Sequence, residues 1–255
     1  MKSRFLSALV PAQETASVSE QEMSEQDMAS ELYADLAPVT EYALPEDSAF
    51  AAEVLVEPAP GCLTDLFVPD HYEPNYAYPL LVWLENGPIP EGRLERRMRQ
   101  ISDRNYFGLS VVIDDVDLLE DQLHETFLSL RRQFHLNTER VYLLGCGSAG
   151  TQALATGFQQ PDWFAGIAAL SSEWPEADRP LLRYQALRGK RVLLGVTDAD
   201  EAPLLADTAY AARLLWTAGM HVTTVSTSGS DPLRPMLREV DRWVMQAIAE
   251  PELVC

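Results

Sequence analysis

Apolar residues along this chain gather in short uninterrupted runs, separated by stretches in which they recur every three or four residues. Short runs cover residues 78–86 (YPLLVWLEN), 107–115 (FGLSVVIDD) and 165–171 (AGIAALS). Runs of this length without polar interruption are typical of strands that are buried on both faces of a parallel sheet. Similar runs predict further strands over residues 140–145, 191–198 and 221–227.

Segments with helical periodicity lie between these strands. Residues 117–135 (DLLEDQLHETFLSLRRQFH) carry leucine and phenylalanine at helical spacing, which places these side chains on one face of a helix. Residues 207–219 show the same periodicity and end at Gly219, a residue type that commonly follows the last helical turn. Helices are also predicted over residues 92–105, 149–159 and 237–249.

This alternation of strands and helices predicts an α/β fold. Residues 51–70 (AAEVLVEPAPGCLTDLFVPD) have the pattern of two antiparallel strands around a Pro-Gly turn. We therefore expect a mostly parallel central sheet with an N-terminal antiparallel hairpin and helices on both faces. In such sheets the functional groups lie beyond the carboxyl ends of the strands, so these ends are where chemistry is expected.

The first 48 residues differ in composition from the rest. The stretch ETASVSEQEMSEQDMASE is rich in Glu, Ser and Gln and contains no aromatic residue. A segment of this kind buries too little apolar surface to offset the entropy of ordering it. We predict an acidic disordered tail over residues 1–48 and one folded domain over residues 49–255. The tail is interpreted as a solubilising segment or, alternatively, as a segment that binds a partner.

A net charge of −20 restricts the partners. A surface this acidic repels phosphate backbones and anionic lipid headgroups, so neither nucleic acid nor a membrane surface is an expected partner. No apolar run is long enough for a membrane span, and a cytoplasmic protein is the default expectation. Cys62, Cys146 and Cys255 lie far apart and lack the spacing of metal ligands or of a disulfide framework. Composition does not fix the oligomeric state.

Residues 140–151 (RVYLLGCGSAGT) join a predicted strand to a predicted helix through a run of small residues. Serine hydrolases place the nucleophile on such a strand–turn–helix, in the pattern G-x-S-x-G. Three other segments accompany this one: FVPDHYEPNYAYPLLVWLENG before it, and QQPDWFAGIAALSS and RVLLGVTDADEAPLLADTAYAARLLWTAGMHV after it.

In order and spacing, these four segments resemble the α/β-hydrolase family, in particular its phospholipase/carboxylesterase branch with the esterase-D-like enzymes. The resemblance covers residues 53–248. It implies the α/β-hydrolase fold and hydrolysis of carboxylic esters or thioesters. It also implies a catalytic triad in the chain order Ser, Asp or Glu, then His.

The resemblance allows two alignments at the nucleophile. Aligned without gaps against R-V-x-L-x-G-x-S-x-G-G, the Arg-Val pair and Gly145 match, and the nucleophile position falls on Gly147. Glycine has no side chain with which to attack a substrate, and this alignment is favoured. The alternative, C-G-S-A-G, needs one inserted residue and centres on Ser148, with Cys146 and Gly150 two residues to either side. Cys146 is interpreted as a small buried residue of the turn.

No histidine stands where the resemblance requires the catalytic base. Three histidines precede the turn, and the fourth begins the last predicted strand, at the wrong end of the sheet. In the loop after that strand, Ser230 or Asp231 stands at the histidine position. The four histidines are His71, His124, His135 and His221.

The acid and the oxyanion turn are partly retained. Asp200, in the stretch TDAD, aligns with the triad acid of the family's G-x-x-D, with Thr197 in place of the glycine. The oxyanion turn reads ENGPIP, from Glu85 through Asn86 and Gly87. Glu85 takes the histidine place and is expected to add negative charge where an anion would bind. The two prolines of this turn have no N–H to donate.

These residues support two interpretations of function. The first is an α/β-hydrolase-fold protein with an eroded triad, weakly active or non-catalytic, which binds a small ester-like ligand or a protein partner. The second is an active carboxylic-ester or thioester hydrolase that uses Ser148 as nucleophile and Asp200 or Asp231 as an atypical base. A carboxylate is a poor base for a serine hydroxyl unless burial has raised its pKa.

Two further hypotheses concern charge. Acidic residues at predicted strand ends could gather around Mg²⁺ or Ca²⁺, although solvated loop carboxylates are the commoner finding in so acidic a chain. We therefore predict no metal and no cofactor. The basic segment 92–102 (GRLERRMRQIS) is a candidate partner for the acidic tail. The carboxylates in question are Glu85, Asp114, Asp115 and Asp200.

Overall fold

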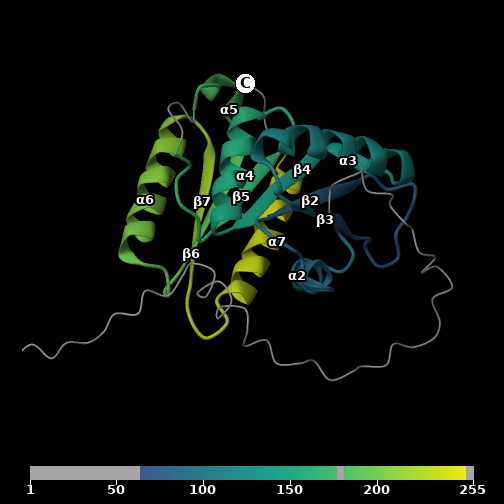
Figure 1. Ribbon diagram of the computed structural model, residues 1–255, viewed down its shortest axis with the longest axis horizontal. Helices are drawn as coiled ribbons and strands as arrows, with labels where there is room; N and C mark the ends of the chain where they lie inside the picture. Colours follow the sequence, from purple (N-terminus) through teal and green to yellow (C-terminus); the bar gives the residue numbers. More distant parts are fainter. Residues whose placement is uncertain (1–63, 177–180, 251–255) are drawn as a thin grey trace, which may run out of the picture. The chain divides into compact units, whose positions relative to one another are not determined.

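A seven-stranded sheet forms the centre of the part of the chain that the structure describes (Figure 1). The computed structural model describes residues 64–176 and 181–250. The strand order is β1-β3-β2-β4-β5-β6-β7, and every neighbouring pair is parallel except β1 with β3. The strands are β1 (Thr64–Phe67), β2 (Tyr78–Glu85), β3 (Phe107–Val112), β4 (Leu136–Cys146), β5 (Gly166–Leu170), β6 (Arg191–Thr197) and β7 (His221–Thr227).

Helices cover both faces of the sheet. Leu80, Val82 and Leu84 of β2 face a core that includes side chains of α3, α4 and α6, whereas Leu81 and Trp83 face side chains of α2 and α7. Because both faces are covered, β2 is buried over its whole length, which explains its unbroken apolar sequence. The helices are α2 (Arg93–Ile101), the 3₁₀ helix η1 (Val116–Leu118), α3 (Leu119–Gln133), α4 (Ser148–Gln159), α5 (Tyr184–Leu187), α6 (Ala202–Thr217) and α7 (Leu233–Ala249).

The predicted fold class is confirmed, with differences at element boundaries. β4 begins at Leu136, four residues before the predicted strand. The sequence did not indicate these first residues because they are partly exposed and lack an apolar pattern. α6 begins at Ala202, where Pro203 occupies the first turn and fits helical backbone without needing an N–H donor. α7 begins at Leu233, and the short α5 has no counterpart among the predicted elements.

The structure describes only part of the predicted N-terminal hairpin and none of the predicted tail. β1 is the second arm of the predicted hairpin, and it pairs antiparallel with β3. The first arm and the predicted tail over residues 1–48 lie outside the described residues. None of the described helices is long and apolar enough to cross a bilayer.

The parallel strands end together on one side of the sheet, which we call the carboxyl edge. The loops there begin at Asn86, Ile113, Gly147, Ser171 and Asp198. The loop 228–232, which follows β7, completes this edge. The residues that the sequence assigns to a catalytic site lie at these strand ends, in these loops or in the first turn of α4, and therefore at the carboxyl edge.

Candidate active site at the carboxyl edge

The turn between β4 and α4 is one residue long. β4 ends at Cys146, α4 begins at Ser148, and Gly147 between them has φ +57° and ψ −133°. The Gly147 N–H donates to the carbonyl of Leu170 at 2.9 Å, which holds the turn against the end of β5. Residues other than glycine rarely adopt this backbone conformation. The tip of the strand–turn–helix is therefore Gly147.

Close packing within the turn explains its small residues. A Cβ atom on Gly145 would lie 2.3 Å from the carbonyl oxygen of Ala149, and one on Gly150 would lie 2.8 Å from the Cβ of Ser172. In contrast, a Cβ on Gly147 would meet no atom within 4 Å. Space for a side chain is thus present at the tip, whereas Gly145 and Gly150 have none.

Ser148 is the first residue of α4, one position past the tip, and its side chain is exposed. Its Oγ accepts a hydrogen bond from the side-chain amide of Asn86, which lies in the loop after β2. An amide N–H is a donor and cannot take a proton from the hydroxyl. Asn86 therefore positions Ser148 without activating it.

Asp200 is held by two donors. Its Oδ2 accepts from the Ser171 hydroxyl at 2.9 Å and from the Thr197 N–H at 2.6 Å. Ser171 has φ +45°, a strained conformation for a residue with a side chain, and it directly follows β5. The carboxylate at the triad-acid position thus ties the end of β5 to the end of β6.

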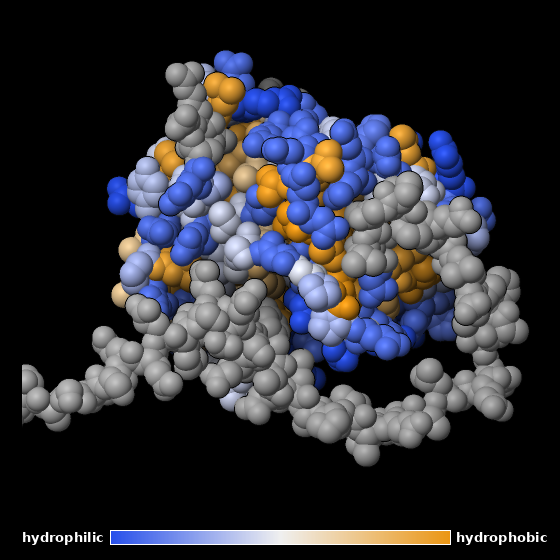
Figure 2. Space-filling model, viewed as in Figure 1, coloured by the Kyte–Doolittle hydropathy of each residue, from blue (hydrophilic) through white to orange (hydrophobic). Residues whose placement is uncertain are grey.

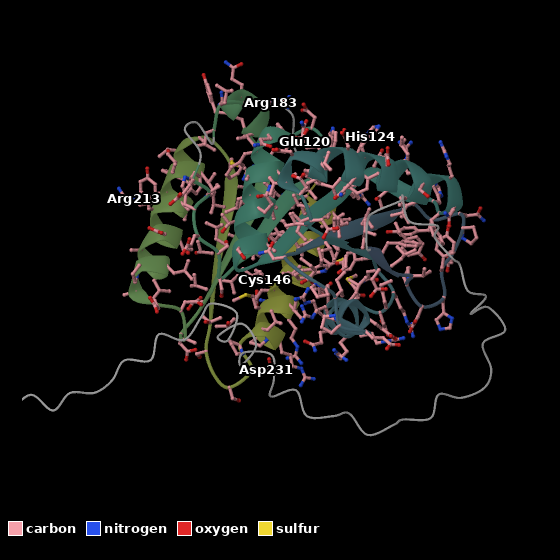
Figure 3. The ribbon with its side chains drawn as sticks, in the orientation of Figure 1. Glu120, His124, Cys146, Arg183, Arg213 and Asp231 are labelled. Atoms are coloured by element: carbon pink, nitrogen blue, oxygen red, sulfur yellow. The ribbon has the colours of Figure 1, made fainter. Side chains whose placement is uncertain are left out.

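Asp231 and the histidines are placed differently. Asp231 is exposed in the loop before α7, and Figure 3 shows it apart from Cys146. His124 lies on α3, with its ring 5.7 Å from that of Trp163, and Figure 3 places it far from both Cys146 and Asp231. His221 begins β7, at the opposite edge of the sheet.

The last two histidines also belong to that opposite edge. His71 follows β1, which runs antiparallel to β3, and the neighbouring Asp70 N–H donates to the carbonyl of Asp103 in front of β3. The carbonyl of His135 accepts from the N–H of Tyr78, the first residue of β2. All four histidines of the chain are within the described residues, and none of them lies at the carboxyl edge.

Glu85 corrects one expectation. It is 7% exposed, and its carboxylate pairs with Arg97 and, at 3.4 Å, with Arg93, both on α2. The guanidinium of Arg97 also lies over the ring of Trp83, 4.9 Å from the centroid. Glu85 therefore adds no uncompensated negative charge to the oxyanion turn. The basic character of segment 92–102 is explained in part by this pairing within the domain.

Cys146 borders the same group of charges. Burial raises the pKa of its thiol, and the nearby positive charge of Arg97 offsets this only in part. A thiol with a raised pKa has little thiolate at neutral pH and is a weak nucleophile. This agrees with the interpretation of Cys146 as a small residue of the turn.

The four carboxylates considered for a metal site are not gathered. Glu85 is paired with arginines, Asp115 accepts from the N–H of Asp117 at the start of η1, and Asp200 is held by Ser171. Within 64–176 and 181–250, no group of three or more His, Cys, Asp or Glu side chains is arranged to hold a metal ion.

Sequence reasoning missed Ser171, Arg93 and Arg97. A hydroxyl directly after a buried strand was a usable signal for Ser171, because that position belongs to the carboxyl edge. The arginines had a weaker signal. They lie four residues apart and therefore share one face of α2, and a buried acidic residue ends the preceding strand.

Comparison with known proteins identifies similar structures but no similar sequence. No protein-family model matches the chain, and no curated protein matches it in sequence. Among solved structures, a thermostable esterase matches with a TM-score of 0.56 and 14% identity, over 72% of this chain and 58% of the esterase. A ferulic acid esterase matches with a TM-score of 0.56 and 15% identity, over 73% of this chain and 97% of the other.

A third match is FphF, a fluorophosphonate-binding serine hydrolase of Staphylococcus aureus, with a TM-score of 0.53 and 12% identity, over 71% of this chain and 91% of the other. At these identities the likeness concerns the fold. The chain has the α/β-hydrolase fold that the sequence resemblance implies.

Three glycine substitutions separate crowding from backbone strain. We expect Gly145→Ala to be the most destabilising, because its Cβ would meet backbone atoms of α4, with an overpacking cost of about 1–3 kcal/mol or more. Gly147→Ala meets no atom but keeps φ +57°, at a cost of roughly 1–3 kcal/mol. Gly87→Ala meets neither problem and should change the unfolding free energy by less than about 0.5 kcal/mol. Urea unfolding measures all three. A Gly145→Ala protein as stable as Gly87→Ala would contradict the described turn.

Removing the Glu85 charge should be costly. Glu85→Gln leaves the buried guanidinium of Arg97 without this carboxylate, and a broken buried ion pair costs roughly 3–5 kcal/mol. Glu95→Gln is the matched control, because the Glu95–Arg99 pair is exposed and contributes about 0.5 kcal/mol or less. Equal unfolding free energies for the two variants would show that Glu85 is not buried with its partners.

Cys146 should react slowly with iodoacetamide at neutral pH in the native protein. The raised pKa leaves less thiolate, so the alkylation rate should be lower than in urea-unfolded protein and should rise with pH. Mass spectrometry of the peptide that contains Cys146 distinguishes it from Cys62 and Cys255. A native rate equal to the unfolded rate would refute the raised pKa.

Proposed function

We propose that this protein is a non-catalytic or nearly inactive member of the α/β-hydrolase fold, which uses the carboxyl edge to bind a small ester-like ligand or a protein partner. By resemblance the protein is grouped with the carboxylesterase-like members of the fold, but its main activity is binding and not ester hydrolysis. In such a protein the fold persists because binding still requires it, while the demand on the catalytic groups has relaxed.

The conformation of Gly147 is the observation that carries the proposal. The nucleophile of this fold stands on a sharp, strained turn from strand to helix. The residue with that conformation here is Gly147, at φ +57° between β4 and α4, and the space for its side chain is empty. These facts favour the gap-free alignment, in which the nucleophile has been replaced by glycine.

The surroundings of the tip support the same conclusion. A serine nucleophile needs an imidazole to take its proton. The four histidines lie on α3 or at the opposite edge of the sheet. Asp200 retains an ordered carboxylate, but its Oδ2 is bonded to Ser171 and Thr197 and has no imidazole to orient.

The alternative is hydrolysis by Ser148. In its favour, the hydroxyl is exposed at the carboxyl edge and touches the oxyanion turn through Asn86. Against it, the contact is with an amide donor, and among the described residues no hydrogen bond joins Ser148 to Asp200 or Asp231. An unactivated serine hydroxyl is a weak nucleophile.

Fluorophosphonate labelling of the full chain tests the proposal, because the probe reacts with activated serines. We expect no labelling of the wild-type protein and no difference in the Ser148→Ala variant. A known serine hydrolase serves as the positive control for the probe, and circular dichroism establishes that both samples are folded.

Labelling at Ser148, located by mass spectrometry and abolished in Ser148→Ala, would overturn the proposal. It would show an activated serine one residue past the tip, and Asp200→Asn and Asp231→Asn would then identify its base. Labelling at Ser171, which the same spectrum distinguishes, would equally contradict a non-catalytic carboxyl edge.

A further inference from the structure

β7 ends the sheet on one side, and no strand within 64–176 and 181–250 pairs with its outer edge. Its sequence, HVTTVST, contains no Asp, Glu, Lys, Arg or Pro, and most of its side chains are exposed. β7 pairs with β6 in unbroken register, without a bulge. Proteins usually protect edge strands with charge, proline, bulges or cover, and β7 has none of the first three. This edge is suited to pairing with another strand.

The hydrogen-bonding groups that β7 offers can be assigned. The His221 N–H donates to the carbonyl of Lys190 at 2.9 Å, and the carbonyl of Thr227 accepts from the Asp198 N–H at 3.0 Å. Since residues two apart in a strand share orientation, the odd-numbered residues of β7 bond to β6. The N–H and C=O groups that point away from the sheet belong to Val222, Thr224 and Ser226.

We propose that a second copy of this chain adds its own β7 to this edge, antiparallel, about a two-fold axis at Thr224. In this register Thr224 faces Thr224 of the partner subunit, and Val222 faces Ser226 of the partner subunit. Every outward N–H and C=O of the strand then has a partner, which amounts to about six hydrogen bonds, two for each facing pair. No register shifted by two residues pairs all three outward residues.

Charge at the two ends of β7 explains why the occupant is a second copy. Arg188 packs beside Gly219, where its Nε lies 3.4 Å from the position of a Cβ, so the strand begins at a basic end. The strand ends beside Asp198, whose Oδ2 accepts from the Gly229 N–H at 3.4 Å. In the antiparallel pair, the end of β7 beside Arg188 lies at the same end of the combined sheet as the end beside Asp198 of the partner subunit. The basic end of each copy is thus brought toward the acidic end of the other, and symmetry repeats this attraction at the other end of the strand pair.

A side of α6 extends the surface. Four apolar residues at intervals of four, three and four form a stripe beside the buried face of the helix, and two of them are large and exposed, Leu205 at 40% and Trp216 at 71%. The β6–α6–β7 crossover is right-handed, and so is the helix itself. Together these two senses turn the stripe of α6 toward the free edge of β7. Figure 2 shows apolar side chains among the polar ones over α6. The stripe consists of Leu205, Ala209, Ala212 and Trp216.

The two-fold axis brings the α6 stripes of the two copies to the same face of the combined sheet. Each stripe can then cover the other, as unpartnered apolar helix faces do in bundles. The hydrogen bonds of β7, the paired charges and the apolar stripes all favour one arrangement. Proteins that dimerise in this way bury the same patch on both copies, as a two-fold interface requires.

Sedimentation equilibrium of the full chain across a concentration series tests the proposal. We expect the mass to rise from 28.4 kDa to twice that value. Thr224→Lys places two lysines opposite each other at the axis and should raise the dimer dissociation constant roughly tenfold or more. Thr217→Lys adds the same charge on the solvent-facing side of α6 and should leave it unchanged. A monomer at every concentration, or a Thr224→Lys protein that dimerises like Thr217→Lys, would overturn the proposal.

Charge reversal tests the antiparallel orientation. Within one chain Arg188 and Asp198 lie beside opposite ends of β7, and a strand of seven residues spans roughly 23 Å, so they do not contact each other within one copy. We expect Arg188→Asp and Asp198→Arg each to weaken the dimer several-fold, and the double variant to restore it to within about twofold of wild type. Circular dichroism confirms folding of each variant. Single variants that weaken the dimer without rescue in the double variant would refute the antiparallel orientation.

Discussion

The close approach of α4 to β4 is the constraint on which the carboxyl edge depends. With 2.3 Å between a Cβ on Gly145 and the carbonyl of Ala149, the chain must reverse from strand to helix within a single residue. The residue at this position, here Gly147, has a left-handed φ. A residue with a side chain would need the same backbone conformation there. The fold therefore requires the backbone of the turn, and only catalysis requires a side chain at its tip. A glycine at the tip leaves this packing intact and avoids the strain that a side chain would bring.

Glu85 likewise has a structural role, at a position for which the resemblance implies a catalytic one. In the resemblance, this position belongs to a turn that receives a developing anion. Here the carboxylate is directed into the space between β2 and α2, where Arg97 and Arg93 pair with it. Arg97 also stacks on Trp83, so one buried group of charges and one ring fasten α2 to the sheet. Burying these charges is favourable only because each has a partner, which makes the group a structural unit.

The order of strands and helices could be predicted because the two kinds of element leave different apolar patterns. Strands buried on both faces give unbroken apolar runs, whereas helices give apolar residues every three or four positions. The sequence predicted boundaries less well where the signal is local, as at Pro203, whose role as a first-turn residue has no periodicity. At the turn it left two alignments, because small residues fill every position from Gly145 to Gly150 and the spacing alone does not separate them. The dihedral angles of Gly147 favour one of them. The contact of Asp200 with Ser171 joins residues 29 positions apart, beyond the reach of any local pattern.

Net charge and local charge act on different length scales in this protein. A chain of charge −20 repels its own copies at long range, yet at physiological ionic strength the Debye length is only about 8 Å. Contacts between copies are therefore decided by the charges within the contact itself. β7 carries none, and the groups that flank it have opposite signs at its two ends. An antiparallel partner meets attraction at both ends, whereas a parallel one would bring acid to acid and base to base. The same acidic composition that argues against nucleic acid and membranes is thus compatible with self-association, provided that the association uses this uncharged strand.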